Sequence, residues 1–234
     1  MLDRPPRERV FNIPAVILAL VVALGLIHAV LVLALSDKQT TEFLLLFAFI
    51  PARYDSGALA DVAWPGGLAA DIWTFASYAL IHGDLNHLFF NAIWLLAFGS
   101  PVARRFGPWR FILFFIASAA GGAVVHLITH FGQLLPMIGS SAAISGAMAA
   151  AIRFAFQYGG PLGFLGGGAH GYRVPAASLS ESFRDPRVLA FLLVWFGQCA
   201  DRVGLIHAAR HGACGRLAGA YRRLCGRAVR VCVI

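Results

Sequence analysis

Three serines lie in an apolar stretch that runs from Pro136 to Ala150, with the sequence PMIGSSAAISGAMAA. Ser140 and Ser141 follow Gly139 directly, and Ser145 comes one helical turn later. A hydroxyl group in hydrocarbon costs free energy unless it has a partner, so these serines need an explanation. One explanation is that one of them is a nucleophile at the start of a membrane helix. The other is close helix packing by small residues four apart, in the series Ser141, Ser145, Ala149 and Gly139, Ala143, Ala147.

A histidine and an asparagine in a second apolar segment supply the groups that such a nucleophile needs. His87 and Asn91 are four residues apart, so on a helix they share one face. Polar side chains inside a membrane usually face the helix bundle, either for hydrogen bonds between helices or for function. An Asn amide and a His N–H are good donors to an oxyanion. Together with Ser141, this pair indicates acyl transfer.

The composition is typical of a polytopic membrane protein, since 59% of the 234 residues are hydrophobic and 13% are charged. Soluble domains carry about twice that charged fraction. Several apolar runs approach or exceed the roughly 18–20 residues that cross a bilayer, so we expect an all-α transmembrane helix bundle. The expected elements are spans at 13–35, 82–98, 111–131, 138–156 and 188–197, a re-entrant or interfacial piece at 43–50, and a basic turn at 99–110.

The arginines indicate how these spans are oriented. They cluster in residues 1–12, 99–110 and 153–187, whereas the other two loops hold only Lys38 and Arg53. The positive-inside rule then places the N-terminus in the cytoplasm. Ser141 would lie near the outer face, where water can reach it and the positive end of its helix dipole favours negative charge.

Residues 198–234 form a tail whose composition differs from the rest. The tail holds seven of the 19 Lys and Arg residues, one of the 11 Asp and Glu residues, and all four cysteines. The net charge of +8 is therefore mostly a property of this tail and does not indicate nucleic-acid binding. Because no cysteine precedes the tail in the sequence, the rest of the chain has no disulfide framework and no cysteine metal site.

These pieces together resemble the rhomboid family of intramembrane serine proteases, in the form common in alpha-proteobacteria. The resemblance covers about residues 10–197 and is carried by HGDLNHLFFN (82–91), GSPVARRFG (99–107), GSSAAISGAM (139–148) and LAFLLVWFG (189–197). It implies a bundle of six helices, about five of them readable here, that cleaves peptide bonds in or beside transmembrane segments. It implies no cofactor or metal, transmembrane protein substrates in a lipid bilayer, no nucleic-acid partner, and a place in the bacterial inner membrane.

The resemblance also assigns roles to single residues. The family's nucleophile corresponds to Ser141, and its oxyanion donors correspond to His87, Asn91 and the backbone N–H of Ser141. Ser145 is an alternative nucleophile by composition, but it lies one turn deeper. Ala142 stands where the family usually has glycine, and its methyl group would crowd the substrate or a helix contact.

The general base of the family has no counterpart in its expected context. The resemblance implies a Ser–His dyad whose histidine lies on a sixth span, in a segment like A-H-x-G-G, and a hydroxyl is a weak nucleophile without such a base. The tail offers only His207 and His211, in other contexts. His126 and His130 lie on the third span, and we interpret them as polar lining or interface residues.

A shifted reading frame would explain the tail. The genetic code permits Gly212–Leu217, read one base later, to give A-H-V-G-G-L, and Gln198–Val203 to give N-V-L-T-G-L. We therefore predict a cytoplasmic segment at 1–12, a rhomboid-like membrane domain at 13–197, and an aberrant Arg- and Cys-rich tail at 198–234 in place of the sixth span. A frameshift is the explanation that we favour for this tail, and the alternative is a divergent end. The alternative function is a catalytically inactive rhomboid-like protein that binds membrane-protein clients.

Overall fold

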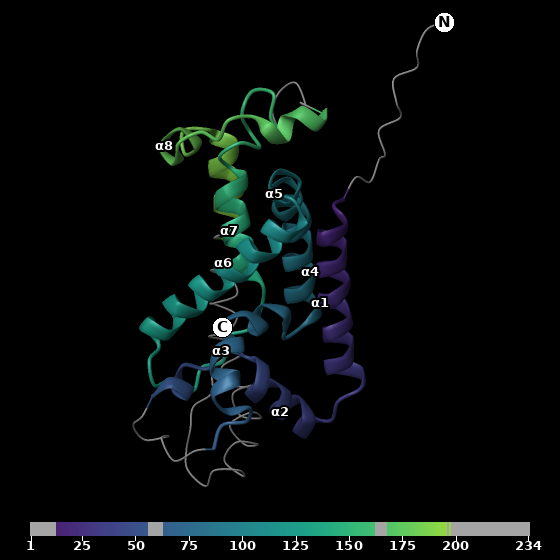
Figure 1. Ribbon diagram of the computed structural model, residues 1–234, viewed down its shortest axis with the longest axis vertical. Helices are drawn as coiled ribbons and strands as arrows, with labels where there is room; N and C mark the ends of the chain where they lie inside the picture. The colour runs from purple at the N-terminus through teal and green to yellow at the C-terminus, as the bar shows by residue number, and fades with distance from the viewer. Residues whose placement is uncertain (1–12, 56–62, 162–167, 196, 198–234) are drawn as a thin grey trace, which may run out of the picture.

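The computed structural model describes residues 13–55, 63–161, 168–195 and 197, and this part of the chain is helical. The helices form one elongated bundle, with α2 and α3 at one end and α5 and α8 at the other (Figure 1). The described residues contain one isolated β-bridge, between Phe49 and Met137, and no longer strand. The predicted all-α class is therefore confirmed. The elements are α1 (Ala15–Leu33), α2 (Asp37–Phe47), η1 (Pro51–Tyr54), α3 (Gly67–Ser77), η2 (Tyr78–Leu80), α4 (Leu85–Trp94), η3 (Leu95–Gly99), α5 (Ser100–Phe106), α6 (Pro108–Thr129), α7 (Ser141–Ala151), η4 (Gly168–Arg173), α8 (Leu179–Ser182) and a last helix at Pro186–Trp195.

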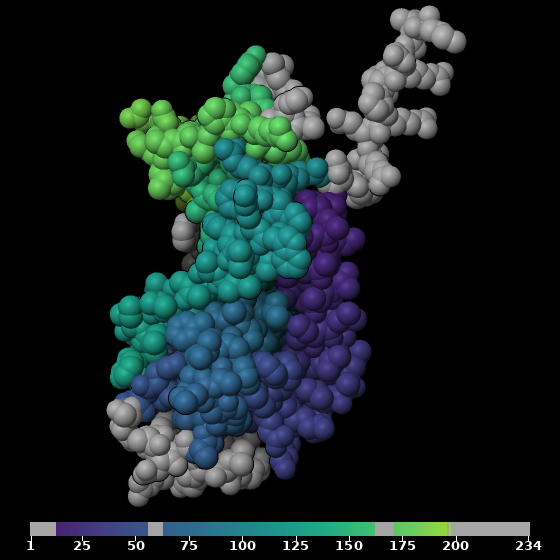
Figure 2. All heavy atoms as spheres, viewed as in Figure 1, coloured from purple at the N-terminus to yellow at the C-terminus, as the bar shows by residue number. Residues whose placement is uncertain are grey.

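Within the described residues, three helices are long and apolar enough to cross a membrane: α1, the run Leu85–Phe106, and α6. α1 shows the pattern of a helix between protein and lipid. Only a narrow stripe of it is buried, while Leu26, Val32 and other large apolar side chains remain exposed. An apolar helix that is hydrophobic all round belongs in a membrane when its outer face has no protein partner. In Figure 2, α1 (purple) runs along one side of the molecule.

The prediction of a basic turn at residues 99–110 is wrong. The helix continues from α4 through a π-helical segment at Leu95–Gly99 into α5, and it ends only at Phe106. Pro101 has no N–H to donate, and the wider π turn just before it accommodates the lost helical bond. The chain turns instead at Gly107, whose φ of +79° suits glycine, and Pro108 opens α6.

The last two apolar helices also have other bounds than expected. α7 begins at Ser141 and not at Ile138, because Gly139 has a φ of +105° and cannot continue a helix. After Ala151 the chain forms turns up to Phe156, where the prediction extended the helix. The last helix begins at Pro186, before the expected Val188, since proline suits the first helical position.

α6 and α7 pack closely because both carry small residues at their contact. A Cβ on Gly122 of α6 would collide with the Cβ of Ala142, and a Cβ on Gly146 of α7 would collide with the Ser118 side chain. Small residues four apart thus pack the two helices, but Ala142 and Gly146 belong to neither of the two predicted series. Of the two predicted series, the one with Ala143 and Ala147 is buried, at 1% exposed each. The series with Ser141, Ser145 and Ala149 is only partly buried or exposed.

The long connection between the first two spans folds into what we call the α2–α3 platform, made of α2, η1 and α3. The expected apolar piece at 43–50 is the second half of α2 and the extended residues after it, too short to span. The guanidinium of Arg53 holds the platform together from inside. It donates to the carbonyls of Leu45 and Pro65, forms an ion pair with Asp71 at 3.3 Å, and lies 5.1 Å from the Trp64 ring centroid.

Other side chains of the platform also donate to backbone carbonyls. The Tyr54 hydroxyl donates to the Asp71 carbonyl at 2.7 Å, Trp73 Nε1 to the Leu46 carbonyl at 2.9 Å, and Ser77 Oγ to the Phe47 carbonyl at 2.7 Å. Burial raises the pKa of Tyr54, so the phenol, already protonated at neutral pH, remains a donor under more alkaline conditions as well. The C-terminal end of α2 is therefore tied to η1 and α3 by side chains that donate to its backbone.

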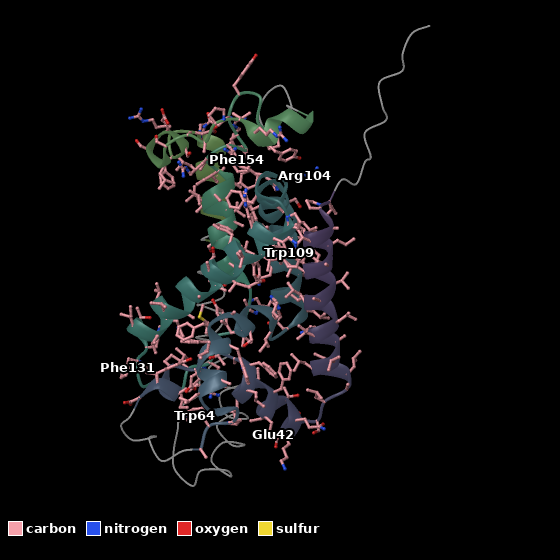
Figure 3. All side chains as sticks on the ribbon, viewed as in Figure 1. Glu42, Trp64, Arg104, Trp109, Phe131 and Phe154 are labelled. Carbon is pink, nitrogen blue, oxygen red and sulfur yellow. The ribbon has the colours of Figure 1, made fainter. Side chains whose placement is uncertain are left out.

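The opposite end of the bundle carries the Gly- and Pro-rich connection between the fourth and fifth spans. Arginines from the helix ends hold this connection. Arg105 of α5 donates to the carbonyls of Tyr172 and Val174 at 3.2 and 2.6 Å, and Arg153 Nε donates to the Ala177 carbonyl at 2.8 Å. Arg104 and Phe154 mark this end in Figure 3, and Glu42 and Trp64 mark the platform end.

Candidate active site

Ser141 is the first residue of α7 and is partly exposed. The first backbone N–H groups of a helix have no intrahelical acceptor, and the helix dipole makes this end positive. The hydroxyl and the backbone N–H of Ser141 therefore lie where negative charge is stabilised. This is the position that a nucleophile with its own oxyanion donor requires.

The loop that leads into Ser141 is fixed by the platform and by η2. Met137 and Phe49 exchange two backbone hydrogen bonds, at 2.8 and 3.2 Å, and Gly139 N donates to the Tyr78 carbonyl at 3.0 Å. The Tyr78 hydroxyl in turn donates to the Ala119 carbonyl of α6 at 2.8 Å. The direction in which α7 starts is thus set by segments more than fifty residues away in sequence.

His87 lies directly against this loop. A Cβ on Gly139 would be 2.5 Å from His87 Nε2, so the imidazole occupies the space that a side chain at residue 139 would take. Asp84 caps α4 by accepting a hydrogen bond from His87 N at 2.8 Å, which fixes the first turn of that helix. The structure therefore brings His87, expected from its spacing alone, to the loop two residues before Ser141.

Asn91 lies one turn beyond His87 on α4 and is 5% exposed. Its Nδ2 donates one hydrogen bond to the His87 carbonyl at 2.9 Å. An amide group has two N–H donors, so the second remains for another acceptor. Asn91 Oδ1 has no hydrogen-bond partner among the described residues. A buried amide with unused capacity beside His87 fits a polar site better than it fits a contact between helices.

Behind the loop, Ser140 lies with two histidines, His82 and His28, for which the sequence patterns predicted no role. His82 Nε2 lies 3.4 Å from Ser140 Oγ, and both residues are buried, at 2% and 0% exposed. His28 of α1 donates through Nδ1 to the His82 carbonyl at 3.1 Å, and the His82 and His87 rings are 4.9 Å apart. The sequence feature that could have indicated this set is the presence of a histidine in each apolar run, His28 inside the first and His82 at the start of the second.

Ser145, the alternative nucleophile, has its hydroxyl engaged within the helix. Its Oγ donates to the Ser141 carbonyl at 2.8 Å, the usual back-bond of a helical serine. Ala142, which stands where the resemblance leads one to expect glycine, places its methyl group against Gly122 of α6, which has no side chain of its own. The predicted crowding of a helix contact is therefore relieved by glycine on the other helix.

The two histidines of the third span have structural partners. His126 is buried and donates through Nε2 to the Leu135 carbonyl at 3.0 Å, and His130 Nδ1 lies 2.8 Å from Thr129 Oγ1. His126 is thus an interface residue, as interpreted, and it ties α6 to the loop before Ser141. The described residues contain no group of three or more His, Cys, Asp or Glu side chains placed to hold a metal ion. His207, His211 and the whole 198–234 tail lie outside the described residues.

Comparisons with known proteins point to one family. A family model described as the Rhomboid domain matches residues 69–168, which include His87, Asn91 and Ser141. The chain is 33% identical over 86 residues to the Rhomboid protease GlpG of Enterobacter sp. (strain 638), a match that covers 36% of this chain and 31% of that protein. It is 40% identical over 57 residues to RHOMBOID-like protein 12, mitochondrial, of Arabidopsis thaliana, covering 24% of this chain and 17% of that protein. The chain therefore spans about a third or less of the length of these relatives.

Proposed function

Because the chain belongs to the rhomboid family and is an integral membrane protein, we propose that it is an intramembrane serine endopeptidase. Its substrates would be membrane proteins, cleaved in or beside their transmembrane segments. The observation that carries the proposal is the position of His87 against Gly139, two residues before Ser141. An imidazole there, an unused amide N–H on Asn91 and a helix N-terminus together suit an oxyanion beside a serine.

The proposed reaction begins with attack of Ser141 Oγ on the scissile carbonyl carbon. A C–O bond forms, the serine proton passes to a general base, and the carbonyl π electrons move to the oxygen. The N–H groups of His87, Asn91 and Ser141 hold this oxyanion. Collapse of the intermediate breaks the C–N bond, and the leaving amine takes the proton from the base. Water then hydrolyses the acyl-enzyme by the same steps, which releases the acid and regenerates the serine.

We place the general base after Gly197, in the part of the chain that follows the fifth span. His207 and His211 are the candidates in the present reading frame. The histidine of A-H-V-G-G-L is the candidate in a frame shifted by one base, and we favour this one. Seven arginines lie in residues 198–234, and each costs about 2.5–3.5 kcal/mol at the centre of a bilayer on insertion scales. The present tail should therefore not insert as a sixth span.

The nucleophile is tested by cleavage of a model transmembrane substrate by the shifted chain. Ser141→Ala should abolish cleavage, whereas Ser145→Ala should leave most of it, because the Ser145 hydroxyl is bonded within its own helix. Asn91→Ala should slow cleavage by roughly 100- to 1000-fold, the usual effect of losing one oxyanion donor. Full activity of Ser141→Ala would refute the assignment.

We also propose that the N-terminus and the α5 end lie in the cytoplasm of a bacterium, with the protein in the inner membrane. The arginines at the α5 end support this orientation by the positive-inside rule. All four natural cysteines lie in the tail and can be replaced by serine before labelling. A membrane-impermeant thiol reagent added outside should then label a cysteine at Gln133 and spare one at Arg105. The reverse pattern would overturn the orientation.

The second candidate function is that of an inactive relative that binds membrane-protein clients. The observation that favours it is the lack of a histidine in the family's context in the present frame. Under this alternative, a client peptide would cross-link to the protein with the same yield in wild type and in Ser141→Ala. No serine-directed probe would react with Ser141, even in the shifted chain.

A further inference from the structure

Basic residues crowd the end of the molecule that is opposite the α2–α3 platform. We call this set the arginine collar: Arg104, Arg105, Arg153, Arg173, Arg184 and Arg187. Described acids at that end are Glu181 and Asp185, and both are bound locally. Glu181 accepts from the backbone N–H and the hydroxyl of Ser178, at 2.9 and 2.7 Å, and Asp185 pairs with Arg187 at 2.6 Å. The collar therefore carries a clear excess of positive charge.

The protein fixes several of these guanidinium groups without neutralising them. Arg105 donates to two backbone carbonyls and lies 4.7 Å from the Phe154 ring centroid. Arg104 lies 5.0 Å from the Tyr172 ring centroid, and Arg153 uses its Nε on the Ala177 carbonyl. Carbonyls and aromatic rings are neutral partners, so the full charge remains while the side chains lose mobility.

Three members of the collar are also exposed to solvent. Arg153, Arg173 and Arg184 face outward, and large apolar side chains beside them are exposed as well, with Tyr158 at 78% and Phe183 at 46%. Exposed arginines and aromatic rings at the end of spanning helices are the composition of a membrane interface. The charge, the donors and the position all match one partner, a phosphate ester in the headgroup layer.

We propose that the arginine collar binds the headgroups of anionic phospholipids in the leaflet at that end of the bundle. Guanidinium groups match phosphate oxygens with paired N–H donors. Those of Arg104, labelled in Figure 3, and of Arg105 are already held in place against aromatic rings. Among the described residues, the platform end offers no comparable site, because Arg53 is buried and Lys38 stands beside Asp37 and Glu42. The proposal does not depend on protease activity.

The test uses the full chain in bilayers of phosphatidylcholine, with spin-labelled phosphatidylglycerol or phosphatidylcholine as the probe. Electron paramagnetic resonance gives the relative association constant of the two lipids at the protein boundary. We expect a constant above one for phosphatidylglycerol in low salt, falling toward one in about 1 M salt, where the Debye length is near 3 Å. Arg173→Gln with Arg184→Gln should lower the constant by about twofold or more, since one basic residue contributes about fivefold at an anionic surface and the boundary average dilutes the effect.

The matched control is Lys38→Gln, which removes one exposed charge from the other end and should leave the constant unchanged. Arg173→Gln alone, with helix content checked by circular dichroism, keeps the test valid if the double variant fails to fold. The arginine-rich tail and the arginines of residues 1–12 are the same in all variants. An unchanged constant in the collar variants would therefore assign the binding to these two segments and overturn the proposal. Full competition by inorganic phosphate at the concentration of the lipid phosphate would also overturn it.

Discussion

At both ends of the molecule, arginine side chains hold loop segments against the helices, but the surroundings of these arginines differ. On the α2–α3 platform, the Arg53 side chain is 1% exposed and pairs with Asp71 at 3.3 Å. At the opposite end, Arg187 is 48% exposed and pairs with Asp185 at 2.6 Å. By distance alone the second pair would be the stronger one. Solvent screening and the lack of burial reverse that order, so burial and not distance ranks these contacts.

The difference in burial between the two arginine contacts corresponds to different roles of the two ends. Phe49, between α2 and η1 of the platform, forms the backbone bridge with Met137, and η2 supplies the carbonyl that binds Gly139 N. Both contacts fix the start of α7, where the proposed nucleophile lies. The opposite end holds its connection by charged groups that remain open to solvent and to lipid headgroups. Changes at matched positions in the two ends should therefore have unequal effects.

The largest expected difference is between two glycines of positive φ. Gly139→Ala would place a methyl group 2.5 Å from His87 Nε2 at a φ of +105°, so the imidazole must leave its position beside the loop. We expect cleavage by the shifted chain to fall to background. Gly159→Ala, with a φ of +74° and its nearest contact at 3.9 Å, should cost only backbone strain of about 1–2 kcal/mol. Equal activity of the two variants would show that His87 is not needed where it lies.

The next difference concerns the two arginines. Arg53→Gln removes two carbonyl contacts and an ion pair from a buried site, so it should lower the free energy of unfolding by about 2–3 kcal/mol. Arg187→Gln should lower it by less than about 1 kcal/mol, because its pair with Asp185 is exposed. Denaturant titration in detergent micelles, followed by circular dichroism, measures both. A larger loss for Arg187→Gln would contradict the ranking by burial.

The smallest difference is between two buried serines. Ser140→Ala removes the contact with His82 at 3.4 Å, and we expect it to slow labelling of Ser141 and to cost about 1 kcal/mol. Ser182→Ala removes a bond that Ser182 donates within α8, to the Ser178 carbonyl at 2.9 Å, and should not change the labelling rate. The two variants are distinguished by treating each with a fluorophosphonate, stopping the reactions after equal times and comparing the amount of labelled Ser141. Identical rates for Ser140→Ala and wild type would remove His82 from the account of the site.

Sequence alone was informative where a local pattern has a direct physical meaning. The four-residue spacing of His87 and Asn91 put both on one face of α4, and the apolar runs predicted α1 and α6 closely. The prediction of a turn at residues 99–110 failed. Gly-Ser-Pro indicates a turn, and the sequence does not reveal the π-helical segment before it, through which the helix continues. The contacts of His28 and His82 were not predictable, since they depend on how α1 packs on the start of α4.

The central claim, that Ser141 is a nucleophile whose base comes from a histidine after Gly197, is tested most directly by residue-mapped labelling. The chain with its present tail and the chain shifted by one base after Gly197 are each treated with a fluorophosphonate, with Ser141→Ala as the control for both. Mass spectrometry of the peptides then locates the label. We expect label on Ser141 in the shifted chain, little in the present chain, and none in either control. Equal labelling of both chains, or label that persists in Ser141→Ala, would contradict the account.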